Sequence, residues 1–198
     1  MLEHIQYFIG GRVRISSDKT DVLWVTDDQT VIKRILHIFD RYPPLTSRVT
    51  LQLKFMRHCF HHRNIDIYFN ERGFKFANRL NVINSFSNVD LLTLPYYSSW
   101  LSGFMEAEAC FSARNEPNTD VHSFSIGQNH DKYLIESIKS YFQAMNEVRE
   151  PYKNFHSLEV YRKETLLCIY NHIHHYPLLG HKRSQAFNFN SKVFSELK

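Results

Sequence analysis

Hydrophobic and polar residues alternate along two neighbouring stretches in the second half of the chain. In residues 109–115, Phe111 and Ala113 alternate with polar side chains, and residues 121–128 alternate in the same way. A period of two is typical of half-buried strands. Residues 115–120 between them are rich in Asn, Pro and Asp, which favour turns. This pattern predicts a β-hairpin with one side against a core.

Apolar residues at helical spacing follow this hairpin, so the same half of the chain should also contain amphipathic helices. Helices are expected at 130–145, 164–174 and 184–197, a further strand at 156–161, and in the first half of the chain a hairpin at 12–16 and 22–26. A mixture of hairpins and amphipathic helices predicts an α+β fold.

The two halves of the chain resemble each other. The segment Tyr42-Pro43-Pro44-Leu45 corresponds to Tyr176-Pro177-Leu178-Leu179, and the residues before and after these segments match in the same order at nearly the same spacing. Self-similarity at a fixed spacing indicates an internal repeat. We predict an incomplete first repeat at 1–63, a connector at 64–95 that is partly helical around 69–80, and a complete second repeat at 96–198.

Composition narrows the class of protein. The chain has 198 residues, 43% of them hydrophobic, with a formal net charge of +4 and three cysteines. No run approaches the roughly 20 apolar residues of a membrane helix, and no signal-peptide pattern opens the chain. The odd cysteine count without a C-x-x-C pair predicts neither a disulfide framework nor a zinc ribbon. A basic chain is compatible with a polyanionic partner.

The segment with the most suggestive chemistry is a predicted helix that ends just before the hairpin. Gly103 and Ala107 are four residues apart, so they share a helix face and would allow another backbone to approach closely. Glu108 stands at the C-terminal end, where the helix dipole disfavours an anion. A divalent cation is one candidate for the compensating charge.

The whole segment 100–111 resembles the signature of the LAGLIDADG homing endonucleases. That resemblance implies twisted antiparallel sheets that form a DNA saddle with helices behind them. It also implies that Glu108 is the metal-binding acid, and that Gln128 and Lys182 order water and stabilise charge near the scissile phosphate. Arg48 stands in the first repeat where Lys182 stands in the second. In one departure from the family pattern, Ala109 occupies the usual glycine position.

By the same resemblance we expect an intron-encoded, site-specific endonuclease that hydrolyses double-stranded DNA with Mg²⁺ or another divalent cation. Polar residues on the outer strand faces are the candidate DNA contacts. They are Arg12, Arg14, Ser16, Trp24, Thr26, Arg48, Ser112, Arg114, Ser123, Ser125, Ser157, Glu159 and Tyr161. The repeat spacing places the first copy's motif before Met1, so we expect the chain as given to bind DNA and to cut it poorly. Self-association through the motif helix, or an upstream segment, would supply a second acid.

Two other functions remain open at this point. An RNA maturase that assists intron splicing is one alternative, because the basic, aromatic stretch 69–76 could stack on RNA bases. A zinc site on the histidines at 58–62 or 172–175 is another, although neither cluster has Cys or acidic residues at ligand spacing. Reading frames of this family commonly lie in organelle introns, which implies a mitochondrial protein, with the chloroplast as the alternative.

Overall fold

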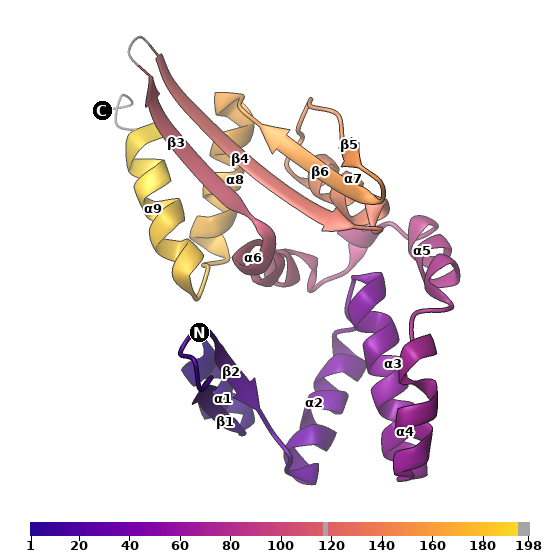
Figure 1. Ribbon diagram of the computed structural model, residues 1–198. Coiled ribbons are helices and arrows are strands. Elements are labelled where there is room, and N and C mark those ends of the chain that lie inside the picture. Colours follow the sequence, from indigo (N-terminus) through magenta and orange to yellow (C-terminus); the bar gives the residue numbers. More distant parts are fainter. Residues whose placement is uncertain (117–118, 194–198) are drawn as a thin grey trace. The chain divides into compact units, whose positions relative to one another are not determined.

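The computed structural model describes residues 1–116 and 119–193, without the side chains of 114–121 and 190–193. The chain divides into two compact units, the first spanning Met1–Pro44 and the second beginning at Leu45 (Figure 1). None of the described helices is both long and apolar enough to cross a membrane.

The first unit is small. Its elements are the helix α1 (Leu2–Ile9), the antiparallel strands β1 (Arg12–Ile15) and β2 (Val22–Val25), and the helix α2 (Gln29–Arg41). Asp28 caps α2 by accepting a 2.7 Å hydrogen bond from the backbone N–H of Thr30, an arrangement that satisfies one of the free donors at a helix start. No side chain between Met1 and Pro43 is buried.

The second unit contains a four-stranded antiparallel sheet in the order β3-β4-β6-β5. Its strands are β3 (Cys110–Glu116), β4 (Thr119–Asn129), β5 (Arg149–Tyr152) and β6 (Phe155–Val160), and the helices behind it are α6 (Tyr97–Glu108), α7 (Lys132–Tyr141), α8 (Lys163–His175) and α9 (His181–Val193) (Figure 1). Phe124, Ile126, Leu158 and Val160 point from the sheet into the core between the two layers. This arrangement leaves the other side of the sheet open.

A run of further helices precedes this sheet and belongs to the same unit. It comprises α3 (Ser47–His62), α4 (Ile65–Glu71), η1 (Arg72–Phe74), α5 (Arg79–Ser87) and η2 (Leu91–Thr93). The start of α3 is attached to α7 by two hydrogen bonds, from the Ser47 N–H to Asp131 Oδ2 (2.9 Å) and from the Tyr133 hydroxyl to the Leu45 carbonyl (2.9 Å). Burial raises the pKa of the Asp131 carboxyl.

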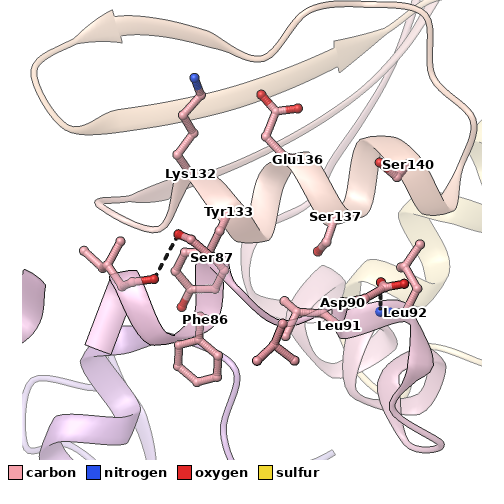
Figure 2. A pocket seen from close by; sticks show the side chains of 12 residues that line it. Phe86, Ser87, Asp90, Leu91, Leu92, Lys132, Tyr133, Glu136, Ser137 and Ser140 are labelled. Atoms are coloured by element: carbon pink, nitrogen blue, oxygen red, sulfur yellow. Dashed lines mark hydrogen bonds between the residues drawn. The ribbon is translucent and has the colours of Figure 1, made fainter. Parts of the chain in front are cut away.

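The other end of this run packs along α7 (Figure 2). The Phe86 and Tyr133 rings stack with their centroids 5.2 Å apart and their planes 14° from parallel. Asp90 caps η2 through the Leu92 N–H at 3.0 Å, and Leu91 is buried. These contacts anchor α5 and η2 to the sheet-bearing part of the unit.

The helix bounds reproduce the internal repeat. Helix α2 covers residues 29–41 and α8 covers 163–175, while α3 begins at 47 and α9 at 181. The residues that end α2 and α8 share a backbone conformation, with φ −130° and ψ 75° at Tyr42 and φ −124° and ψ 79° at Tyr176. The order helix, hairpin, helix, helix therefore occurs twice. Compactness divides the chain at Pro44, and the domain limits 63, 64–95 and 96 stay predictions.

The α+β class and the antiparallel sheet backed by helices are confirmed. Two local details differ from the expectation: strand β5 was not predicted, and α9 begins three residues before the expected start at 184. The connector is partly helical around 69–80, as expected, because α4 ends there and η1, a turn and the start of α5 follow. The expected end of the last helix, 194–197, lies outside the described residues.

Candidate active site at the end of helix α6

The helix α6 has one buried side and one exposed side. Leu101, Phe104 and Met105 are buried against the core, while Gly103, Ala107 and Glu108 are exposed. A Cβ atom built on Gly103 would meet no other atom within 4 Å. The small-residue face predicted at Gly103 and Ala107 therefore exists, and among the described residues no backbone approaches it at Gly103.

The two acids of the motif differ in their surroundings. Glu106 accepts two hydrogen bonds at the start of α9, from the Gly180 N–H to Oε2 (3.0 Å) and from the Lys182 N–H to Oε1 (3.0 Å). A carboxylate is favourable there because a helix N-terminus carries free N–H donors and partial positive charge. Glu108 is exposed and has no hydrogen bond or ion pair within the described part of the chain. Only Glu108 is free to bind something else.

Gly180 makes the approach of Glu106 to α9 possible. A Cβ at position 180 would lie 2.8 Å from Cδ of Glu106 and closer still to its Oε1. Because a side chain there would displace the carboxylate, the contact requires glycine. The contact places the backbone of Lys182, in the first turn of α9, next to Glu106 of α6. Glu106 precedes Glu108 by two residues on that helix. The predicted helix 184–197 did not include Lys182, and the role of Glu106 was not predicted.

Gln128 lies near the end of β4. It pairs with His156 and, by alternation, shares the core side of the strand with Phe124 and Ile126. The side chain is half-buried, and its Oε1 accepts a 3.1 Å hydrogen bond from the Asn129 N–H. The structure therefore places Gln128 on the side of the sheet that faces the helices.

The predicted outer residues of the second repeat lie on the open side of the sheet. Ser112 pairs with Ser123 and Ser125 pairs with Glu159, and paired residues share a face. Ser157 shares that face, because its neighbours His156 and Leu158 are buried on the other side. Tyr161 follows β6 and is exposed. The side chain of Arg114 lies outside the described residues.

In the first unit, the predicted grouping of outer residues was wrong. The register pairs Val13 with Trp24 and Arg14 with Leu23, so Trp24 lies on the opposite face of the ribbon from Arg12 and Arg14. By alternation Thr26 is on the side of Trp24, and Ser16 is on the side of the two arginines. Trp24 instead donates a 2.8 Å hydrogen bond from Nε1 to the Gly10 carbonyl, which attaches the hairpin to the end of α1.

Two predicted cations differ in their neighbours. Arg12 forms a two-bonded ion pair with Asp27, at 2.8 and 3.0 Å, and this contact lowers the pKa of the Asp27 carboxyl. Arg48 lies exposed in the first turn of α3, the helix that corresponds to α9. Arg14 is exposed on its strand.

A buried polar network behind α6 was not predicted. His172 on α8 bonds Ser102 through Nε2 and Tyr141 through Nδ1, both at 3.0 Å, and Ser102 donates to the Tyr176 carbonyl. Burial, with the nearby His175, lowers the pKa of His172 to about 4. The network therefore holds a neutral imidazole at neutral pH and attaches the motif helix to α7 and α8. The helical spacing of His172 within α8 was the available signal.

No group of three or more His, Cys, Asp or Glu side chains among the described residues is close enough together to hold an ion. Glu108 supplies one carboxylate of the kind that Mg²⁺ accepts, and Mg²⁺ commonly binds through one or two carboxylates, with water and substrate phosphates as its other ligands. The described residues therefore fit a metal shared with a substrate.

Comparison with known proteins agrees with the family resemblance of the motif segment. The LAGLIDADG endonuclease family matches residues 101–193. The chain is 40% identical, over 96% of its length, to a protein of Debaryomyces hansenii named probable intron-encoded endonuclease aI3, of which it covers 31%. It is 35% identical, again over 96% of its length, to a protein of the same name from Dictyostelium citrinum, of which it covers 77%.

A solved structure of I-SmaMI bound to an uncleaved DNA target with calcium ions matches 99% of this chain and 76% of that one, with a TM-score of 0.74 and 18% sequence identity. This likeness shows the fold. The Dictyostelium relative, with the family match over residues 101–193, shows that the chain belongs to the LAGLIDADG endonuclease family. The chain spans about a third of the length of the Debaryomyces relative.

Proposed function

We propose that the chain is part of an intron-encoded homing endonuclease that binds double-stranded DNA on the open face of its sheet and hydrolyses it near Glu108. The observation that carries this proposal is the difference between the two acids of the motif: Glu106 holds α9, while Glu108 is exposed at the end of α6 and has no partner among the described residues. The relatives are named as intron-encoded endonucleases.

A divalent cation such as Mg²⁺ would be held by Glu108 and would supply Lewis-acid stabilisation of charge and activation of water. Glu108 itself contributes a carboxylate that is not occupied by a protein partner. Lys182, on the first turn of α9, would stabilise negative charge that develops on the phosphate. Gln128 would orient water. These roles follow the family resemblance and stay proposals.

The serines of the open face suit recognition of DNA, since Ser hydroxyls donate to and accept from base edges and phosphates. A two-stranded antiparallel ribbon also fits the width of the major groove. In the first unit, the corrected register leaves Arg12, Arg14 and Ser16 together on one face, and Trp24 and Thr26 are no longer proposed as contacts of that same face.

The test is cleavage of a plasmid library of candidate sites, assayed with Mg²⁺ and with Ca²⁺. Replacement of Glu108 by Gln keeps the size of the side chain and removes its charge, so we expect the weak cleavage of this chain to be lost while DNA binding persists. The matched control is Glu147→Gln, at an exposed acid far along the chain. Cleavage that survives Glu108→Gln would refute the assignment.

The relatives carry endonuclease names, which favours an endonuclease over the maturase alternative. Self-association through the exposed face of α6 stays a proposal, and sedimentation of the purified chain with and without DNA tests it. The intron-encoded relatives also support an organelle gene, and we propose the mitochondrion as its location.

A further inference from the structure

The positive charge of the chain is concentrated in one segment. Residues 45–88 contain seven Lys or Arg and two Asp or Glu, a net charge of +5, whereas the whole chain has +4. The rest of the molecule is therefore slightly negative. We call this segment, which contains α3, α4, η1 and α5, the basic arm. Clustered charge of one sign attracts a polyanion more strongly than the same charge dispersed over the surface.

Several basic side chains of the arm share a helix face. On α3, Lys54, His58 and His61 recur at spacings of four and three and so lie on one side of the helix. His58 Nε2 lies 3.1 Å from Glu71 Oε2, which joins α3 to the end of α4. Arg63, in a left-handed conformation with φ 51°, ends α3 and is exposed. The two helices lie side by side (Figure 1).

The aromatic rings of the arm support cations. The Arg72 guanidinium lies 5.3 Å from the ring centroid of Phe69 and 5.8 Å from that of Tyr68. Lys75 and Arg79 lie 5.2 and 4.8 Å from the centroid of Phe76. Such contacts hold a long side chain in place. Because the protein's own cations occupy these ring faces, the arrangement favours binding of phosphates over stacking on unpaired bases.

The arm is firmly joined to the sheet-bearing part of its unit. Its start is tied to α7 by the Asp131 and Tyr133 hydrogen bonds, and its end packs on α7 through Phe86 (Figure 2). A phosphate contact on the arm would therefore add to binding by the sheet at little further loss of freedom.

We propose that the basic arm binds the phosphate backbone of duplex DNA, outside the surface of the sheet. This inference rests on the proposed DNA-binding function and assigns it a second, sequence-independent surface. Contacts of this kind contribute affinity through counterion release, with a slope of log K against log salt of about −0.9 per phosphate neutralised.

The test compares two triple variants that lose the same charge. The arm variant is Lys54→Gln, Arg63→Gln and Arg72→Gln. The control variant is Lys33→Gln, Arg34→Gln and Arg41→Gln, at three exposed cations of α2. Binding to a fluorescein-labelled duplex of random sequence is measured by anisotropy between about 50 and 250 mM NaCl, and circular dichroism checks that each variant is folded.

We expect the magnitude of the salt slope to fall by about 2.7 in the arm variant, with the affinity about tenfold lower or weaker still, and to change by less than about 1 in the control. Equal losses in the two variants, or an unchanged slope in the arm variant, would overturn the inference and leave the proposed function standing. A loss seen with a single strand but not with the duplex would overturn it too. If the parent chain binds no duplex at all, the result refutes the proposed DNA-binding function itself, and with it the role of the arm.

Discussion

The first and second copies of the repeat have the same elements and very different interiors. Helices α2 and α8 have the same length and spacing, and end in the same conformation. In α8, Thr165, Leu166, Ile169 and His172 are buried, whereas α2 has no buried residue. The hairpin β1–β2 forms a two-stranded sheet, whereas β5 and β6 complete a sheet of four strands.

The contrast separates local structure from stability. Amphipathic spacing is enough to predict the corresponding helices of both copies, since this signal is short-range. Burial depends on what the elements pack against, and in the second copy α6, β3 and β4 supply that surface. A two-stranded hairpin with exposed Ile15, Val22 and Leu23 gains little from burial and is marginal alone.

The largest expected difference is in the overall stability of the two units. The only tryptophans are Trp24 in the first unit and Trp100 in the second, so Trp100→Phe and Trp24→Phe each leave one reporter. We expect the Trp24 signal to change at much lower urea, with free energies of unfolding that differ by about 5 kcal/mol. Coincident transitions would show that the units unfold together and would refute the contrast.

A matched pair of substitutions tests the contrast at one position of the repeat. Ile35 and Ile169 correspond, and Ile169 is 1% exposed while Ile35 is half-buried. We expect Ile169→Ala to cost about 4 kcal/mol because it leaves a cavity in the core, and Ile35→Ala to cost less than about 1 kcal/mol. Urea unfolding followed by fluorescence measures both. Equal costs would mean that the first unit has a core of its own.

Acid should destabilise the second unit selectively through His172. Its pKa is about 4 in the folded state and about 6.5 when unfolded, so the unfolded chain binds the proton first. The contribution of His172 to the free energy of unfolding is therefore fully present above pH 6.5. It falls by about 3 kcal/mol as the pH drops towards 4. His172→Gln removes the titrating group, and the difference between parent and variant should lose this pH dependence. A parallel pair of pH profiles would contradict the buried neutral imidazole.

Much of the fold and part of the site could be predicted from the sequence. The alternating strands, the amphipathic helices and the candidate Glu108 all depend on neighbours within a few residues. Strand β5 was missed because Arg149–Tyr152 is entirely exposed and shows no alternation. The face of Trp24 was missed because alternation orders each strand separately, whereas the turn sets the register between them. The role of Glu106 depends on Gly180, which is distant in sequence.

The smallest expected effect distinguishes the two acids of α6. Glu106→Gln leaves one N–H at the start of α9 without its acceptor, so we expect a loss of about 2 kcal/mol in the unfolding free energy of the second unit. Glu108→Gln should change it by less than about 0.5 kcal/mol, because that side chain is exposed and has no partner in the described part of the chain. Unfolding of both variants in the Trp24→Phe background measures the two values. The first copy offers the comparison, since α3 is capped instead by Asp131, and Asp131→Asn should lower stability by a similar amount without affecting α9. A larger loss from Glu108→Gln than from Glu106→Gln would show that Glu108 is the structural acid and would contradict its proposed role as the metal-binding acid.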